Sequence, residues 1–178
     1  MRASTAFALG SFVAAAAAVR PFNGPPDQNI TLTVSAGSSL AGHQLIGFVD
    51  GEAGGFPTFV TAAEATESSS IVYMFYKDYG HFGWYSLNID VAGAKYGLDV
   101  DAPDNVYQGL VKFIDSEDYG TNIWKATTDS SAFTWTGDSR DFPFACTGDD
   151  GHVRLGIFTP GSELENCEQV QLEWKTAA

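Results

Sequence analysis

The chain has 178 residues, of which 44% are apolar and 13% aromatic, so it can build one hydrophobic core and is not disordered by composition. Its formal charge is −13, with 22 acidic residues against 9 basic ones. Such a chain repels phosphate backbones and anionic membrane surfaces, which disfavours binding to nucleic acids or to lipid surfaces.

The amino terminus has the pattern of a secretory signal. Arg2 supplies a positive start, and residues 3–18 form an apolar, alanine-rich run that ends in the small residues signal peptidase accepts. The run is shorter than the roughly 20 residues of a membrane-spanning helix, and no later stretch approaches that length. A mature amino-terminal helix is the alternative reading, but the Pro- and Gly-rich residues 19–29 would interrupt it. We therefore expect a signal over residues 1–18, a lead over residues 19–29, and one exported β domain over residues 30–178.

Beyond the lead, apolar residues fall at every second position, which is the period of a half-buried β-strand. Only residues 62–70 could hold a helical turn, and they lack an apolar stripe. Ala92-Gly93 is a short turn that should join its two flanking strands into a hairpin. The predicted strands are 30–35, 40–49, 56–60, 71–76, 85–90, 95–101, 109–114, 122–126, 132–136, 142–146, 152–158 and 170–175.

Roughly ten to twelve short strands, separated by Gly, Asp, Ser and Pro clusters, are typical of a sandwich or a barrel. The chain shows no βαβ alternation, and no linker or charge block divides it. A β-trefoil would need three similar segments of about 40 to 50 residues, and none can be aligned. We therefore predict an all-β fold, a single antiparallel β-sandwich or barrel with one disulfide.

Cys146 and Cys167 are the only cysteines, so in an exported chain they predict one disulfide with one possible pairing. Closing about 20 residues would stabilise the fold by roughly 3 kcal/mol through the unfolded state. A redox pair or metal site is the alternative, but the CxxC spacing and a histidine at zinc-ligand spacing are both absent. Export also makes Asn29, in the sequon Asn29-Ile30-Thr31, a candidate site of N-glycosylation.

No motif in the chain points to a catalytic residue or to a cofactor. Residues 37–42 do not fit the Gly-x-Ser-x-Gly turn of a serine hydrolase, and His43, His81 and His152 lie outside any metal-binding pair. Two carboxylates across a groove would suffice for glycoside hydrolysis, but with 22 acids some pair will always satisfy the spacing. We therefore assign no catalytic residue and no cofactor.

Two groups of aspartates are candidates for a hard cation such as calcium. Asp99, Asp101 and Asp104 place carboxylates at a strand end and in the following turn, but Pro103 breaks the EF-hand template. Turn formation and solubilising charge explain both groups without a ligand, so the first remains only a weak metal candidate. The second, looser group is Asp138, Asp141, Asp149 and Asp150.

Aromatic residues could stack on sugar rings, although aromatic residues on strands first of all pack in a core. Trp84 and Tyr85 follow two glycines, Gly80 and Gly83, that could expose neighbouring rings or simply form a tight turn. With Trp124, they are the candidate ligand-stacking residues.

The second half of the chain carries a pattern of short strands around its two cysteines. The pattern consists of residues 96–101, 108–113, Trp124, 133–137, 142–146, 153–157 and 166–170. It resembles the PhiA-like cell wall proteins of filamentous fungi and related small secreted β proteins, over about half to two-thirds of the mature chain. The chain departs from that family at Thr147, where proline is usual, and in lacking further cysteines in its amino-terminal half. The resemblance carries over no catalytic residue.

Together the signal and the resemblance imply a secreted fungal protein of the cell wall or surface, and the absence of a catalytic motif leads us to expect a non-catalytic one. It would act by structure or binding, with a role in spore or hyphal development. A secreted effector or host-interaction protein, and a glycan-binding or glycan-active protein, are the alternatives. Expected partners are cell wall polysaccharide or an extracellular protein, with no nucleic acid and no membrane span.

Overall fold

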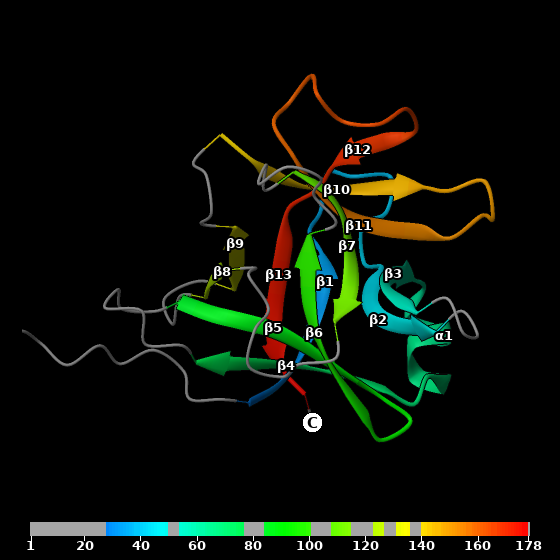
Figure 1. Cartoon of the computed structure of the whole chain (residues 1–178), viewed down its shortest axis with the longest axis vertical. Helices are drawn as coiled ribbons and strands as arrows, with labels where there is room; N and C mark the ends of the chain where they lie inside the picture. The colour runs from blue at the N-terminus through cyan, green and yellow to red at the C-terminus, as the bar shows by residue number, and fades with distance from the viewer. Residues whose placement is uncertain are drawn as a thin grey trace, which may run out of the picture.

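The computed structural model describes residues 28–49, 54–76, 84–100, 108–114, 123–126, 131–135 and 140–177. Within these residues the chain forms thirteen strands and one short helix, and every strand pairing is antiparallel (Figure 1). The predicted all-β fold is confirmed. The predicted signal and the lead as far as residue 27 lie outside the described residues.

The strands differ from the predicted ones mainly at their ends. Residues 40–43 form a turn instead of the start of a strand, and the predicted strand 170–175 is divided between two strands. The strands are β1 (Gln28–Val34), β2 (Gln44–Val49), β3 (Gly55–Val60), β4 (Ser70–Tyr76), β5 (Trp84–Val91), β6 (Ala94–Val100), β7 (Gly109–Ile114), β8 (Ile123–Ala126), β9 (Ala132–Trp135), β10 (Phe142–Thr147), β11 (Val153–Phe158), β12 (Cys167–Gln169) and β13 (Leu172–Thr176).

Eight of the strands close into a barrel, which decides between the two predicted architectures. Their order is β11-β3-β2-β1-β4-β5-β6-β7, and β7 pairs back to β11. The hairpin of β5 and β6 turns at Ala92 and Gly93, as predicted. These two residues have φ values of 54° and 85°, the left-handed backbone that a two-residue hairpin turn of this kind requires.

The other strands extend the barrel at two places. β10 pairs with β11 and carries β12 on its outer edge, while β13, β9 and β8 form a second connection from β1 to β5. In Figure 1, β10 and β12 lie at the top of the molecule, β9 and β8 lie at the left, and β13 runs between them. The segment 170–171 leads from the first extension into the second.

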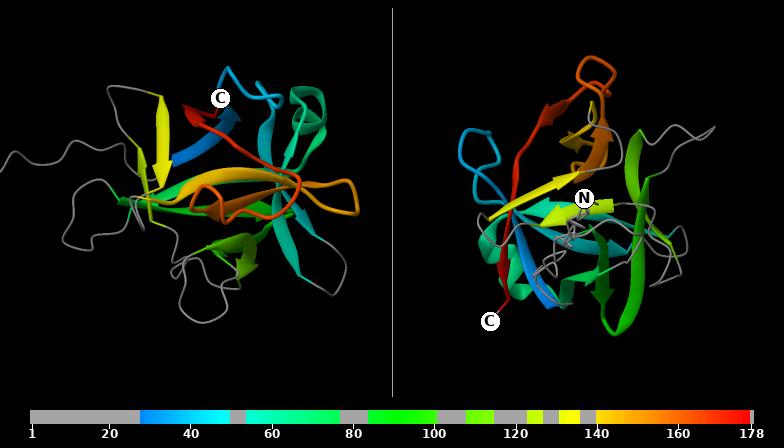
Figure 2. Two further views of the ribbon diagram at one scale, coloured as in Figure 1. Left: turned by 90° about the horizontal axis from the view of Figure 1, so that it is seen from above. Right: turned by 90° about the vertical axis from the view of Figure 1, so that its left-hand side faces the viewer.

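The helix α1 (Ala62–Glu67) lies outside the barrel beside β2, within the predicted helical turn (Figure 2). A capping box starts it, because the backbone N–H of Thr61 donates to Glu64 Oε2 at 2.9 Å and Thr61 Oγ1 accepts from the backbone of Glu64 at 3.4 Å. None of its residues is buried, as the missing apolar stripe implies. Among the described residues, no helix has the length and apolar character needed to cross a membrane.

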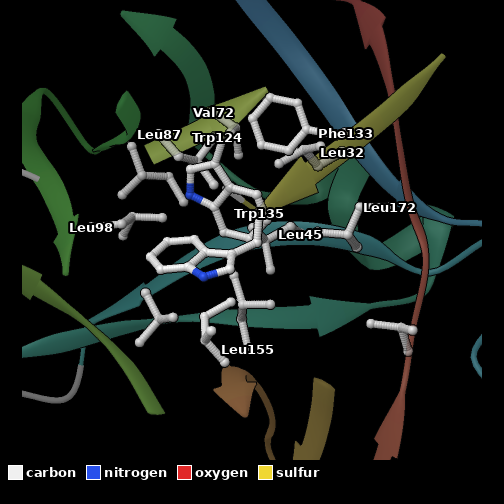
Figure 3. Packing of buried hydrophobic residues seen from close by; sticks show 14 of the residues in the cluster. Leu32, Leu45, Val72, Leu87, Leu98, Trp124, Phe133, Trp135, Leu155 and Leu172 are labelled. Atoms are coloured by element: carbon white, nitrogen blue, oxygen red, sulfur yellow. The ribbon is translucent and has the colours of Figure 1, made fainter. Parts of the chain in front are cut away.

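Side chains that alternate along the strands fill the barrel interior, as the period of two predicts. Trp124 is fully buried there, stacked on Phe133 with ring centroids 5.1 Å apart and edge-on to Trp135 at 5.4 Å. Figure 3 shows the two indole rings in the middle of the cluster, surrounded by leucines from facing strands.

The predicted disulfide is confirmed. Cys146 and Cys167 lie directly opposite each other on β10 and β12 and are bonded. With Phe144 and Phe158 they belong to a small second cluster, separate from the barrel core. The disulfide therefore fastens the outermost strand, which has only three residues, to the rest of the sheet.

Candidate functional site

A groove opens where the two extensions of the barrel part from each other. Its first part is a cavity of about 560 Å³ lined by Ser35 and by residues 131–135, 141–143 and 169–173. These residues come from β9, from the start of β10, and from the segment that joins β12 to β13. The cavity is within the size range of small-molecule binding sites in proteins.

The groove exists because one stretch of chain changes partner. Gln169, the last residue of β12, pairs with Phe144 of β10, whereas Leu172, the first residue of β13, pairs with Phe133 of β9. Residues 170 and 171 lie between these two positions. Of their backbone groups, the N–H of Val170 still bonds to β10, donating to the carbonyl of Pro143 at 3.0 Å. β9 and β10 therefore diverge, and the space between them is open.

A second cavity, of about 380 Å³, continues the first. It is lined by residues 35–38, which follow β1, and by Gln169 and Gln171. Ser35, Gln169 and Gln171 line both cavities, so the two are adjacent, and we call them together the groove. We call the part beside Phe133, Trp135 and Phe142 the aromatic branch, and the part between residues 35–38 and the two glutamines the polar branch.

Phe142 presents the exposed ring of the aromatic branch. Its side chain is 39% exposed, whereas Phe133 and Trp135 are 1% and 7% exposed and belong to the core. The reason is the length of β12, which covers β10 only from Phe144 to Cys146 and leaves Phe142 without a neighbouring strand on that edge. An exposed aromatic ring beside a cavity can stack on the apolar face of a ligand.

The polar branch is held by hydrogen bonds between distant segments. Ser38 Oγ donates to Glu168 Oε1 at 2.5 Å and Ser39 Oγ donates to the same oxygen at 2.8 Å. These bonds, that of Ser38 above all, stabilise the charged carboxylate and lower the pKa of Glu168. The backbone N–H of Ser35 also donates to the carbonyl of Gln171 at 2.8 Å. The loop after β1 is therefore tied to β12 and to the segment that follows it.

The groove carries negative charge. Asp141 and Glu173 line the aromatic branch, and among the described residues that line the two branches none is lysine or arginine. Asp141 is 5% exposed, and its Oδ1 accepts from Gln108 Nε2 at 3.0 Å and from Thr159 Oγ1 at 2.5 Å. A site with this charge, and with no lysine or arginine in its described lining, disfavours anionic ligands and favours neutral polar ones.

The structure contradicts ligand stacking by two of the predicted residues. Tyr85 and Trp124 are 1% and 0% exposed, because both side chains belong to the main hydrophobic core. The side chain of Trp84 lies outside the described residues. The sequence signal for Phe142 was only its place at the start of a predicted strand, which does not reveal that the neighbouring strand ends short of it.

Among the described residues, neither aspartate group forms a metal site. Asp99 is half-buried on β6, and its Oδ1 accepts the backbone N–H of Val100 at 2.8 Å, while Asp101 and Asp104 lie outside the described residues. Of the second group, Asp138 is also outside them, and Asp150 bonds to Arg154 in the turn after β10. Within the described ranges, no three His, Cys, Asp or Glu side chains are placed to hold a metal ion.

A separate cavity of about 370 Å³ brings together residues that are distant in the sequence. His43, Glu64, Asp150 and His152 line it. Both carboxylates already have partners, since Glu64 closes the capping box of α1 and Asp150 bonds to Arg154. The hydrogen bond from the Thr61 side chain lowers the pKa of Glu64, and that from the backbone of His152 lowers the pKa of Asp150. His81 lies outside the described residues.

The candidate glycosylation site is on the outer surface of β1. Asn29 is exposed, Thr31 points to the same side, and Ile30 between them is 3% exposed and points into the core. The sequon therefore presents its acceptor side chain to solvent.

Comparison with known proteins adds no relative to this description. No protein-family model matches the chain, and no curated protein or solved structure matches it.

Proposed function

We propose that this is a secreted, non-catalytic protein of the fungal cell wall or surface, and that it acts by binding a neutral carbohydrate in the groove. The observation that carries the proposal is the exposed ring of Phe142 at the edge of a groove whose lining combines apolar residues with hydroxyl, amide and carboxylate groups. The resemblance to PhiA-like wall proteins and the disulfide, which is typical of exported proteins, support the location.

The groove has the chemistry that sugars need from a protein. A pyranose ring has an apolar C–H face, which stacks on an aromatic ring, and a rim of hydroxyl groups, which both donate and accept hydrogen bonds. Gln169 and Gln171 supply amides that do both, and Ser35 supplies a hydroxyl group. The carboxylate of Glu173, which is half-buried, adds an acceptor for sugar hydroxyls.

Glycan cleavage is a second candidate, because two carboxylates, Asp141 and Glu173, line the same branch of the groove. The bonding of Asp141 favours binding over cleavage, since two donors, Gln108 and Thr159, occupy its Oδ1. Incubation with soluble β-glucan or chitin oligosaccharides and an assay for new reducing ends tests cleavage. Release of reducing ends that Glu173→Gln abolishes would replace the binding proposal with an enzymatic one.

The binding proposal is tested by co-sedimentation of the purified protein with insoluble chitin, β-glucan and cellulose. We expect retention on at least one of these, and loss of about tenfold in affinity in Phe142→Ala, which corresponds to about 1.4 kcal/mol. Ile71→Ala is the matched control, because Ile71 is similarly exposed, at 44%, but lies on β4. Absence of binding to all three polymers, or equal loss in both variants, would contradict the proposal.

The location is tested separately in the source organism. We expect the protein in the wall fraction, released by salt or detergent. Recovery of the whole protein from the culture medium would contradict association with the wall and favour a secreted effector.

A further inference from the structure

We propose that the groove binds an extended chain of neutral sugars, with one ring on Phe142 in the aromatic branch and the next ring in the polar branch. The inference rests on the proposed carbohydrate binding and goes further. It names a polymer segment as the ligand and adds a second subsite that binds the next sugar ring. It also assigns Ser38, Ser39 and Glu168 a positioning role.

The first support is that the two branches are adjacent. Three residues, Ser35, Gln169 and Gln171, line both branches, so a ligand that fills one branch lies directly beside the other. Each branch alone, at about 560 and 380 Å³, lies within the range of a small-molecule site. A single sugar would leave one branch empty, whereas a chain can occupy both.

The second support is the orientation of the two glutamines. Gln169 and Gln171 are exposed, and Val170 between them is 2% exposed and packs in the core. In an extended segment, residues two apart share a face, so both amides lie on the groove side. Within the described part of the chain, neither side-chain amide makes a hydrogen bond. Each can therefore offer a donor and an acceptor to the hydroxyl groups of a second sugar ring.

The third support is the way the polar branch is fixed. Glu168 precedes Gln169 directly, and it accepts hydrogen bonds from Ser38 and Ser39 on the opposite wall. The disulfide at Cys167, one residue earlier, fastens the same strand to β10. The width of the polar branch is therefore set by groups that need not touch the ligand, and a fixed width favours one ring size and linkage over others.

The charge of the groove indicates the class of sugar. The carboxylates Asp141 and Glu173 line it, with Glu168 beside it, and its described lining holds no lysine or arginine. Uronic acids and sulfated or phosphorylated sugars would meet like charge, which is unfavourable. A neutral chain, such as a β-glucan or chitin segment, meets no such penalty.

The test is calorimetric titration of the purified protein with two length series, chito-oligosaccharides and β-1,3-gluco-oligosaccharides, each from one to six sugars. We expect one series to gain about tenfold or more in affinity between one sugar and two or three, and little beyond the length that fills both branches. The series that shows this gain identifies the polymer. An acidic series, oligogalacturonates, should not bind.

Variants then locate the second subsite. The double variant Gln169→Ala/Gln171→Ala should abolish the gain in affinity with chain length, so that the affinity for the longer sugars falls at least tenfold more than the affinity for one sugar. Gln28→Ala is the matched control, because Gln28 is seven residues from Ser35 along the same chain, about 20 Å in an extended strand. Because the glutamines are exposed, these variants should fold, and unchanged melting temperatures will check this.

The positioning role is tested at Glu168. Glu168→Ala should lose most of the gain with chain length, whereas Glu168→Gln, which keeps an acceptor oxygen for Ser38 and Ser39, should retain more of it. A merely structural role would lower the melting temperature without this selective effect on longer chains.

The outcomes separate the two proposals. Equal affinity for one sugar and for longer chains, with binding still dependent on Phe142, would overturn the extended-chain proposal alone. A gain with length that survives the double glutamine substitution would also overturn it. Absence of binding to every neutral saccharide would overturn both this proposal and the proposed function.

Discussion

The hydroxyl group of Ser38 donates a hydrogen bond to the carboxylate of Glu168 across 2.5 Å, although the two residues are 130 positions apart in the chain. The bond joins the loop after β1 to β12, which are the two walls of the polar branch. The bond therefore holds the loop after β1 against β12. The strength of this attachment depends on the charge of one carboxylate.

Stability should therefore depend on pH through Glu168. Its pKa is lower in the folded protein than the ordinary value of 4.5, so the charged form stabilises the fold above that value, and the contribution disappears as the pH falls through the folded pKa. We expect the melting temperature of the wild type to fall more steeply below pH 4.5 than that of Glu168→Gln. Thermal unfolding followed by circular dichroism from pH 6 to about pH 2.5 measures this.

The size of this effect should be small, because Glu168 is only half-buried and solvent screens its bonds. Glu64 and Asp150, whose pKa values are also lowered, give the same sign, so the comparison with the variant is needed to isolate Glu168. Parallel pH profiles for the wild type and the variant would show that the charge of Glu168 contributes nothing to stability.

Loss of the disulfide should destabilise the protein. Cys146→Ser/Cys167→Ser is expected to cost about 2 to 4 kcal/mol, because the bond closes a segment with a sequence separation of 21 residues and fastens a strand of three residues. Urea unfolding of the variant, and of the wild type with and without a thiol reductant, measures the cost. Identical unfolding midpoints would contradict the expectation.

Trp124→Ala should unfold or severely destabilise the barrel, by about 3 to 5 kcal/mol, because the ring is fully buried against Phe133 and Trp135. Ile71→Ala, at an exposed position, should change the free energy of unfolding by about 0.5 kcal/mol or less. Equilibrium unfolding in urea compares the two. A stable Trp124→Ala protein that has lost carbohydrate binding would instead support the original stacking prediction for this residue.

Asn29 should carry an N-glycan when the chain is secreted from a eukaryotic host. The prediction follows from the sequon and from the outward orientation of Asn29 and Thr31 on β1. A glycosidase should shift the protein to lower mass, and Asn29→Gln and Thr31→Ala should each remove that shift. A secreted protein of unmodified mass would contradict the prediction.

The sequence by itself determined the elements. Alternation with a period of two sets the strands, because successive side chains of a strand point to opposite faces. Ala92-Gly93 sets the hairpin, since two left-handed residues make the turn whose twist matches paired strands. The presence of only two cysteines sets the disulfide pairing. These are local or exhaustive properties, and a single chain displays them directly.

Only the tertiary structure decided which face of each strand is buried, and which side chains stay exposed where a neighbouring strand ends. Alternation shows that Trp124 and Phe142 each lie on one face, but burial of the first and exposure of the second depend on partner strands far away in the sequence. The groove arises where residues 169–172 change partner from β10 to β9, and its walls come from segments separated by more than a hundred residues. No local sequence pattern predicts which distant strands pair with each other, because this pairing depends on how the whole barrel packs.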